Sequence, residues 1–414
     1  MQTRHPTFEI INSALTNTII FRENKILTDR NAGKVKAVYF SEIAQAGKVL
    51  WDAASAPVDV FLQYDYLSFL EKYPPAGLSF AYLLFFRDDV AVGAAYFQIS
   101  LFDVAKSLSG YFSKGKLNAM SESIAKSLNF NSLVSGNLLL TGEHGFYFKP
   151  EIEAAQQNLM LQAIRFVSAQ IKKEGKAASL TFIKDYHKPL DIFLKKQCGE
   201  FDFQPNMMLN LRAEWENFDD YLDSMSTKYR TRAKRAFKKM ESLELRKLTL
   251  QELEIHQAEI YGLYLNIAKN VGFNLVELHP LYFQEIKRTF GDRYEIWAAF
   301  DGGMLVGFYS TMHNYSELET GFLGFEERYN PTHQIYLNFL YRMVQQGIEK
   351  GVKRIVFART AMEIKSSVGA EPYRMHTYIK HRSKVLNAML PALVKWLSPP
   401  QEWVQRKPFK QQEE

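Results

Sequence analysis

The sequence predicts a mixed α/β fold arranged as two domains. The chain has 414 residues, and single hydrophobic cores seldom grow past about 250–300 residues. Hydrophobic residues make up 47% of the chain, which is enough to fill two cores without disulfides or structural metals. A hairpin, a long helix and a buried strand also occur twice in the same order. This repetition suggests that one α/β unit has been duplicated.

The first copy of the pattern begins with a hairpin. Residues 80–86 are rich in β-forming side chains, and after a short turn residues 90–97 return as a second strand. Apolar residues at helical spacing predict a helix over 152–171, which Gly175 is placed to end. The buried strand at 179–183 completes the copy.

The second copy repeats these signals. Strands are predicted at 294–300 and 304–310, separated by an Asp-Gly-Gly turn. A helix is predicted over 336–348, followed by Gly351 and a strand at 354–358. We therefore expect a mixed sheet in each half of the chain.

Composition shifts suggest where the domains begin and end. Pro205 precedes a short apolar strand, which places the boundary close to it, and residues 101–133 form a Ser- and Lys-rich insertion in the first copy. The expected divisions are an N-terminal arm (1–34), a first domain (35–204), a second domain (205–397) and a disordered tail (398–414).

The composition indicates a cytoplasmic protein. A single cysteine, Cys198, excludes an intramolecular disulfide and a cysteine-rich zinc cage. Residues 1–30 contain no continuous apolar segment of a secretory signal. No uncharged stretch of 18 residues is present, so we expect no membrane-spanning helix.

One short segment carries most of the local positive charge. Tyr229, Ala233, Ala236, Phe237 and Met240 recur at helical spacing and predict one buried stripe. Seven basic residues without an acid among them occupy most of the remaining positions: Lys228, Arg230, Arg232, Lys234, Arg235, Lys238 and Lys239. Such a face favours an anion, either tRNA phosphates, a CoA nucleotide or anionic lipid. A purely solvated basic face is the alternative.

A set of loose segments resembles, by its order, the FemAB-like and double-GNAT acyltransferases of bacteria. The segments are 61–67 with 70–71, 136–148, 221–230, 329–330 with 336–337, and 363–370. In the last one a lysine precedes a glycine, which is similar to the terminal motif of that superfamily. The resemblance covers about residues 60–385 and implies two tandem GNAT-like domains that transfer an acyl or aminoacyl group to an amine. Some such proteins use acyl-CoA, including those that acylate long-chain amino alcohols, and others use aminoacyl-tRNA for cell-wall precursors.

One departure from this resemblance concerns the donor. The glycine-rich acetyl-CoA loop is absent, and Tyr-Asn-Pro-Thr-His-Gln at 329–334 precedes the helix instead. A helix N-terminus can still hold an anion with its free N–H groups. Asn330 and His333 are therefore candidate donor-binding residues; the alternative for His333, favoured by base rates, is a capping or surface histidine.

Acyl transfer to an amine needs a proton acceptor and a group that stabilises the oxyanion. His313 and Glu319 are candidates because they flank a turn and strand after the second hairpin. If this strand is extended, Leu318 and Phe322 share one face, while Glu319 lies on the other face with Glu317. Two close carboxylates would raise one pKa, which suits a base. The alternative is an exposed loop with solvated acids.

A second group of candidates follows the predicted strand at 354–358. Glu363 is the third catalytic candidate, because ligands of open α/β sheets bind near the carboxyl ends of strands. Lys365 could hold a donor phosphate or carboxylate, and Arg359 could assist it as a planar fork. A salt bridge between Glu363 and a neighbouring base is the alternative.

The apolar segment at 385–397 is flanked by Arg382, Lys384 and Lys395. It is too short to span a bilayer, but it could rest on a membrane surface with Trp396 at the headgroups. The alternative is a terminal helix that packs on its domain.

These observations predict an N-acyltransferase with its active site in the second domain. The expected donor is acyl-CoA or another thioester as co-substrate, and the expected acceptor is a primary amine, with a long-chain amine as one option. No permanently bound cofactor, no metal and no DNA partner are expected. An anionic membrane surface is a further candidate partner. The alternatives are an aminoacyl-tRNA-dependent transferase of cell-wall precursors, in which tRNA is the partner, and a non-catalytic ligand-binding protein.

Overall fold

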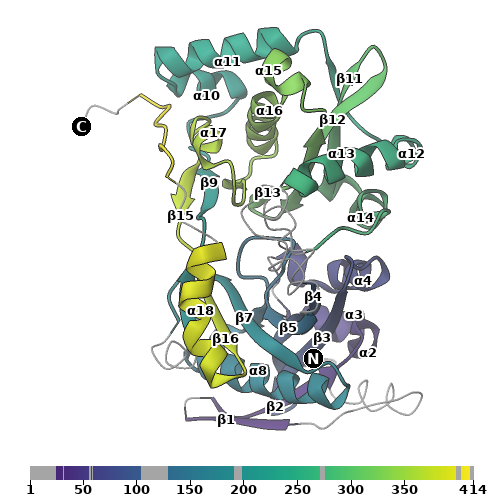
Figure 1. Cartoon of the computed structure of the whole chain (residues 1–414), viewed down its shortest axis with the longest axis vertical. Coiled ribbons are helices and arrows are strands. Elements are labelled where there is room, and N and C mark those ends of the chain that lie inside the picture. Colours follow the sequence, from purple (N-terminus) through teal and green to yellow (C-terminus); the bar gives the residue numbers. More distant parts are fainter. Residues whose placement is uncertain are drawn as a thin grey trace, which may run out of the picture. The chain divides into compact units, whose positions relative to one another are not determined.

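The computed structural model describes residues 25–30, 32–55, 57, 59–103, 129–190, 198–270, 276–397 and 402–410 (Figure 1). It divides into two compact units. The second unit contains Gln204–Arg374 and the segment 402–410, and the first contains the remaining described residues, including 375–397. Each unit has a mixed sheet with helices, so the predicted fold class is confirmed.

The sheet of the first unit has the order β1-β2-β3-β4-β5-β7-β16-β8, and β6 pairs with β4. Its strands are β1 (Lys25–Asp29), β2 (Gly33–Phe40), β3 (Leu78–Arg87), β4 (Val90–Asp103), β5 (Asn129–Ser135), β6 (Phe146–Phe148), β7 (Ala178–Tyr186), β8 (Gly199–Asp202) and β16 (His376–His381). The predicted hairpin is the β3/β4 pair, in which the strands are antiparallel and Leu84 faces Ala94.

Helices connect these strands. They are α2 (Ile43–Ala46), α3 (Lys48–Ala54), η1 (Val60–Leu62), α4 (Tyr64–Lys72), η2 (Pro150–Ala155), α8 (Gln156–Lys173) and α18 (Lys384–Leu397). The apolar side chains of α8, among them Leu159, Ile164 and Val167, lie in the same buried cluster as Phe97 of β4. Gly175 follows α8 with φ 78°, a left-handed conformation that glycine adopts at low cost.

The sheet of the second unit has the order β10-β11-β12-β13-β14-β9-β15. Its strands are β9 (Asn206–Asn210), β10 (Glu244–Lys247), β11 (Tyr294–Asp301), β12 (Met304–Asn314), β13 (Glu317–Phe325), β14 (Arg354–Val356) and β15 (Glu371–Tyr373). Its helices are α10 (Phe218–Ser224), α11 (Thr227–Met240), α12 (Leu250–Ile255), α13 (Gln257–Asn270), α14 (Tyr282–Phe290), η3 (Gly291–Arg293), α15 (Tyr329–His333), α16 (Ile335–Glu349) and α17 (Met362–Ser366).

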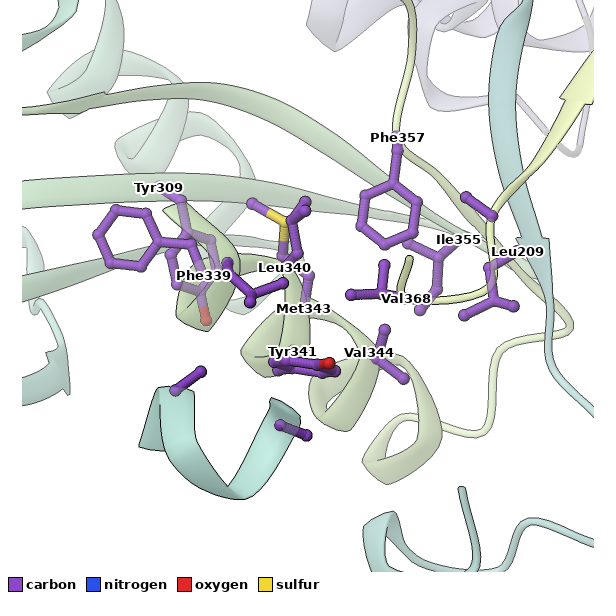
Figure 2. Close-up of a cluster of buried hydrophobic side chains, with 14 of the residues drawn as sticks. Leu209, Tyr309, Phe339, Leu340, Tyr341, Met343, Val344, Ile355, Phe357 and Val368 are labelled. Carbon is purple, nitrogen blue, oxygen red and sulfur yellow. The ribbon is translucent and has the colours of Figure 1, made fainter. Parts of the chain in front are cut away.

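Helix α16 carries the centre of the second core. Its predicted stripe is confirmed, because Leu340, Met343 and Val344 are buried. Figure 2 shows these side chains together with Ile355 of β14 and other members of the same cluster. Tyr309 of β12 packs against α16 in the same cluster. Burial of a large apolar side chain contributes about 1.5–3 kcal/mol, so α16 is held firmly on its sheet.

The two units share one topology. In each, a hairpin is followed by an antiparallel third strand and a long helix, and the strand after the helix lies parallel to the third strand. The parallel pairs are β5/β7 and β13/β14. Two further antiparallel strands complete each sheet, β16 and β8 in the first unit and β9 and β15 in the second. This shared order supports the duplication that the sequence suggested.

The domain division differs from the sequence-based boundaries at 375–397. Strand β16 lies between β7 and β8 and hydrogen-bonds to both, so it belongs to the first sheet although it follows the whole second unit in the chain. Strand β9, which comes directly after the first unit, occupies the equivalent place beside β14 in the second sheet. The two sheets thus exchange one strand each, and a boundary drawn along the sequence cannot represent this.

The chain ends also differ from expectation. Residues 402–410, expected to be disordered, pack on the second unit: Phe409 forms a β-bridge with Met225, and Pro408 O accepts from Ser226 N at 2.9 Å. Within the predicted N-terminal arm, residues 25–29 form strand β1 of the first sheet. The rest of the arm up to residue 24, and most of the insertion at 101–133, lie outside the described residues.

Candidate functional site

A cavity of about 600 Å³ in the second unit is the candidate functional site. It is lined by the start of α11, by α17 and by the C-terminal segment. The lining residues are Lys228, Tyr229, Arg232, Ala361, Met362, Glu363, Ile364, Trp403 and Arg406. The cavity therefore brings two cations of the predicted basic helix together with one predicted catalytic residue, Glu363.

The packing of α11 directs its cations to the cavity. Ala233, Ala236 and Met240 are buried in the core of the unit, as the predicted stripe required. The amide of Asn338 on α16 donates to Ala236 O at 3.0 Å and fixes the helix at this point. Lys228 and Arg232 lie one turn apart on α11, and their side chains are exposed. Both are therefore available to an anion in the cavity.

The C-terminal segment supplies a third cation. Arg406 forms an ion pair with Glu363, in which Nε lies 3.1 Å from Oε1. The backbone N–H of Arg406 donates to Ser366 Oγ at 2.9 Å. Phe409 anchors the segment further on, with the guanidinium of Arg212 over its ring at 4.6 Å. The alternative given for Glu363, a salt bridge with a neighbouring base, is therefore present.

Lys365 does not line the cavity, contrary to its predicted role at a donor phosphate. Its side chain is buried, and Nζ donates to the backbone carbonyls of Phe357 and Arg359, both at 2.6 Å, and of Ala358 at 3.3 Å. Burial lowers the pKa of Lys365 to about 7. Ala358 and two further residues of this loop, Thr360 and Ala361, have positive φ values. Lys365 therefore fixes the strained loop that follows β14.

Arg359 belongs to the same loop and is half-buried. Its carbonyl accepts from Lys365, but its side chain is not among those that line the cavity. The predicted cooperation of Arg359 and Lys365 at one anion is therefore not formed in this conformation.

His313 and Glu319 lie on opposite faces of the second sheet. His313 is paired with Leu318 across β12 and β13, and Leu318 is part of the core on the α16 side. Glu319, which is buried, pairs with Met312 and points to the other face, because side chains alternate along a strand. The structure thus separates these two predicted catalytic residues, and neither lines the cavity.

A bulge in β13 changes the predicted faces of this strand. Two residues of β13, Gly321 and Phe322, face the single residue Ser310 of β12. Phe322 therefore packs against Tyr264 of α13 and not on the face of Leu318. The expectation that Leu318 and Phe322 share one face was wrong, because simple alternation does not hold across a bulge.

Glu317 is neutralised by a neighbour. Its carboxylate lies 3.3 Å from Nη1 of Arg354 on the adjacent strand β14. The two carboxylates of Glu317 and Glu319 share a face, as predicted, but Glu317 is committed to this ion pair.

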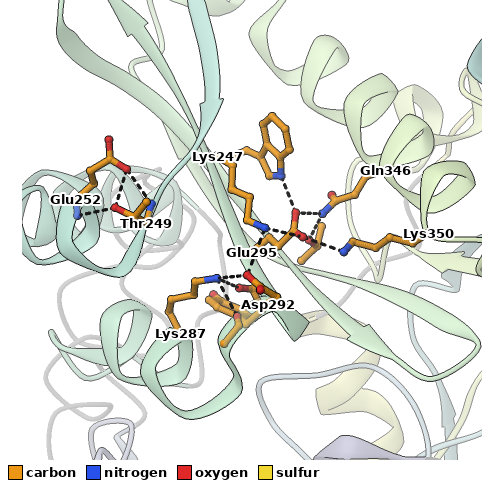
Figure 3. Close-up of polar contacts among 12 residues, drawn as sticks. Lys247, Thr249, Glu252, Lys287, Asp292, Glu295, Gln346 and Lys350 are labelled. Atoms are coloured by element: carbon orange, nitrogen blue, oxygen red, sulfur yellow. Dashed lines mark hydrogen bonds and ion pairs between the residues drawn. The ribbon is translucent and has the colours of Figure 1, made fainter.

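His313 lies in a basic part of the unit. Burial lowers its pKa, and the charges of Lys350 and Arg293 lower it further. Figure 3 shows the polar cluster around the buried Glu295, whose carboxylate accepts from Lys350 at 2.8 Å and from Lys247 at 3.1 Å. This cluster ties α16 to β10 and β11. His313 therefore lies beside a polar cluster that holds secondary-structure elements together.

Asn330 and His333 belong to α15, the short helix directly before α16. The side-chain oxygen of Asn330 accepts from Tyr336 N at 3.4 Å, in the first turn of α16. His333 Nδ1 lies 2.8 Å from Thr332 Oγ1, and its ring packs 5.2 Å from that of Tyr329. Both side chains thus make local contacts, and neither lines the cavity.

The remaining cations of α11 lie outside the cavity. Arg230 forms an ion pair with Asp223 at 2.9 Å, and Lys239 Nζ reaches Pro331 O at 3.5 Å. Lys234, Arg235 and Lys238 are exposed, and within the described part of the chain none of these three forms an ion pair. They extend the positive charge along the helix beyond the cavity.

The parallel pair β13/β14 separates early. Only Glu317, Leu318 and Glu319 of β13 pair with β14, and β13 continues to Phe325. Among the described strands, no other strand takes the place of β14 along the rest of this edge. Some backbone N–H groups of residues 320–325 therefore point away from β12, where an extended ligand or an oxyanion can accept from them.

The sequence does not indicate Trp403 and Arg406 as site residues. Both fall in a polar segment without periodicity, which predicts a disordered tail. The available signal was the presence of the aromatic residues Trp403 and Phe409 among polar neighbours, since aromatic side chains usually pack against something.

No protein-family model matches the chain, and no curated protein sequence matches it. Many solved structures are similar to the chain, among them the following three. A tandem GNAT protein from the clavulanic acid biosynthesis pathway is 11% identical, with 84% of this chain and 99% of that chain covered and a TM-score of 0.48. FemX is 12% identical, with 79% and 97% covered and a TM-score of 0.45. L-PGS from Bacillus licheniformis is 12% identical, with 80% and 95% covered and a TM-score of 0.41. Similarity at this level of identity concerns the fold alone.

Proposed function

We propose that the protein is an N-acyltransferase that takes an acyl group from acyl-CoA, or from another phosphate-bearing thioester, and gives it to a primary amine. The observation that carries the proposal is the cavity with Lys228, Arg232 and Arg406 in its wall. Support also comes from the series of sequence segments whose order resembles that of double-GNAT acyltransferases. The early separation of β13 and β14 is a further support.

The charge of the cavity suits a nucleotide-bearing donor. Three cations and one carboxylate, Glu363, leave an excess of two positive charges. Guanidinium groups bind phosphate with paired hydrogen bonds, and the ammonium group adds a point charge. Tyr229 and Trp403 offer aromatic surfaces on which a nucleobase can stack. The donor's phosphates would therefore bind here without the glycine-rich loop.

The transfer step makes modest demands on the protein. The amine nitrogen attacks the thioester carbonyl carbon, and the resulting oxyanion accepts from backbone N–H groups, for which the open edge of β13 is the candidate. The carbon–sulfur bond then breaks and the thiolate leaves. The amine loses a proton to a base, and the thiolate takes one up. Of the three predicted catalytic residues, Glu363 alone lines the cavity, so we assign it either this proton transfer or the positioning of Arg406.

The test of the cavity is the rate of thiol release from acyl-CoA with a panel of primary amines. We expect Arg232→Ala and Lys228→Ala each to raise the KM for the donor about tenfold, because each removes a charged hydrogen bond worth about 1.5–3 kcal/mol in full contact. Lys234→Ala and Lys238→Ala are matched controls on the same helix, and we expect them to leave this KM unchanged. Equal effects in both pairs would contradict the assignment of the cavity.

Glu363→Gln separates the two roles of this carboxylate. If Glu363 accepts the proton, kcat falls about 100-fold or more while the KM for the donor is retained. If it only positions Arg406, the loss appears in the KM and is matched by Arg406→Gln. Donor binding without turnover by the unmodified chain, with every amine and thioester tried, would indicate the non-catalytic alternative.

A second candidate function has one observation in its favour. The exposed cations Lys234, Arg235 and Lys238 continue along α11 beyond the cavity, over a helix of 14 residues or about 21 Å. This length suits the phosphates of an RNA backbone and hence an aminoacyl-tRNA donor. In that case Lys234→Ala and Lys238→Ala would weaken RNA binding, and the protein would copurify with nucleic acid. Protection against thermal unfolding that increases with acyl-CoA chain length would instead support the first proposal.

A further inference from the structure

Exposed apolar side chains gather on helix α18, which belongs to the first unit (Figure 1). Val385 is 71% exposed, Met389 59% and Leu386 48%. Among the described residues, ten large hydrophobic side chains are exposed, and these three lie within five residues of one another on a single helix. The others are spread over several strands, helices and segments. Scattered exposed hydrophobics are ordinary, whereas a group of them marks an interaction surface.

The opposite face of α18 is firmly packed. Leu390 is buried in a cluster with Phe201 of β8 and Ile379 of β16. The side-chain oxygen of Asn387 accepts from His381 N at 2.8 Å and holds the start of the helix. The helix packs as expected, but on the first unit and not on the second domain to which the sequence assigned it. The exposed face therefore belongs to a helix in a fixed position.

Positive charge surrounds the exposed face. Arg382 and Lys384 lie at the start of α18 and Lys395 near its end, and all three side chains are exposed. The sequence from 382 to 397 contains no acidic residue. Apolar side chains with cations at both ends are complementary to an anionic lipid surface. The cations bind the lipid phosphates, and the apolar side chains insert at the boundary between headgroups and acyl chains.

We propose that α18 docks the protein on an anionic membrane surface. The helix lies in the plane of the interface, with Val385, Leu386 and Met389 inserted at the boundary between headgroups and acyl chains. No helix in the described part of the chain is long and apolar enough to cross a bilayer. The contact is thus peripheral. This proposal is independent of the reaction that the second unit catalyses.

Sedimentation with lipid vesicles tests the proposal on the full chain. We expect binding to vesicles that contain phosphatidylglycerol and much weaker binding to phosphatidylcholine alone. The triple variant Val385→Ser, Leu386→Ser, Met389→Ser should lower the partition coefficient about tenfold or more, because it removes most of the inserted apolar surface. Lys384→Gln with Lys395→Gln should also weaken binding to anionic vesicles, and added salt should do the same.

A matched control uses exposed apolar residues elsewhere. Val49, Ile255 and Met304 are 70%, 71% and 50% exposed, and the triple change of these residues to serine should leave vesicle binding unchanged. Circular dichroism shows whether each variant is folded. Equal binding by the two triple variants would overturn the proposal, and so would the absence of binding to anionic vesicles. A dimer in light scattering that only the α18 variant abolishes would also overturn it, because the face would then be covered by a second copy.

Discussion

The side chain of Lys365 ends among backbone carbonyls of the loop after β14. Two of these carbonyls, from Phe357 and Arg359, lie 2.6 Å from Nζ. The loop contains three non-glycine residues with positive φ, at a cost of about 1–2 kcal/mol each. The lysine therefore offsets backbone strain next to α17, which carries Glu363 into the cavity wall. Lys365, which the sequence predicted as a ligand-binding residue, therefore stabilises the backbone next to the cavity without lining it.

This arrangement predicts a pH dependence of stability. The folded pKa of Lys365 is lowered to about 7, while the unfolded side chain keeps a pKa near 10.5. Between these values the unfolded chain binds more protons than the folded one, so the free energy of unfolding rises with pH, by at most about 1.4 kcal/mol per pH unit. Urea unfolding at pH 7, 8 and 9 measures this rise.

The variant Lys365→Met isolates the contribution. It should remove this part of the pH dependence. The free energy of unfolding of the unchanged chain should therefore rise relative to that of the variant from pH 7 to pH 9, by at most about 1.4 kcal/mol per pH unit. Burial also lowers the pKa of Lys287, but this lysine contributes equally to the pH dependence of both chains. The same pH dependence in the two chains would show that Lys365 does not titrate in this range.

At the scale of elements, the edge of β13 depends on how closely α13 packs on it. A Cβ added at Gly324 would lie 2.4 Å from the backbone carbonyl of Leu263 and 2.7 Å from Tyr264 N. Helix α13 therefore covers one face of β13, while α16 covers the other. Together with the bulge opposite Ser310, this contact sets the course of β13 where it leaves β14.

Gly324→Ala should therefore destabilise the second unit. The new methyl group meets backbone atoms that cannot rotate away, and overpacking of this kind costs about 1–3 kcal/mol. Thermal unfolding measures the loss. Gly262→Ala is the control on α13 itself, where nothing lies within 4 Å of the added Cβ. There the change should raise stability by about 0.5–1 kcal/mol through helix propensity, and a loss of stability in both variants would contradict the packing argument.

At the scale of the whole molecule, the exchange of one strand between the units is the main feature. Strand β8 pairs only with β16 among the described strands, so the last strand of the first sheet depends on a segment that follows the second unit. The first unit can complete its sheet only after residues 376–381 have been synthesised. The order of strands therefore links the folding of the two halves of the chain.

Ile379→Pro tests this link, because Ile379 pairs with Phe182 of β7 and with Gly199 of β8. Proline removes a backbone donor and disrupts a strand that has neighbours on both sides. We expect amide hydrogens of β7 and β8 to lose protection in hydrogen exchange, although β8 lies about 180 residues earlier in the chain. Lys384→Pro is the control, because it places proline at the first position of α18, where it is tolerated. Loss of protection in β14 and β15 with β8 unaffected would contradict the strand exchange.

The sequence by itself determined the local elements of this protein. Both hairpins, α8, α16 and the buried stripe of α11 followed from apolar spacing, because periodicity records which face of an element is covered. The sequence also indicated that the pattern occurs twice and that α11 carries seven basic residues with no acidic residue among them.

The tertiary structure alone decided which distant segments meet. Pairing of β16 with β7, the packing of Phe409 near α11 and the enclosure of Lys365 all depend on contacts between residues far apart in the chain. Such contacts leave no periodic signal, because their energy comes from matching surfaces and not from local spacing. For the same reason the sequence indicated Lys228 and Arg232 as anion contacts and Glu363 as a catalytic candidate, but it did not indicate that they line one cavity with Trp403 and Arg406.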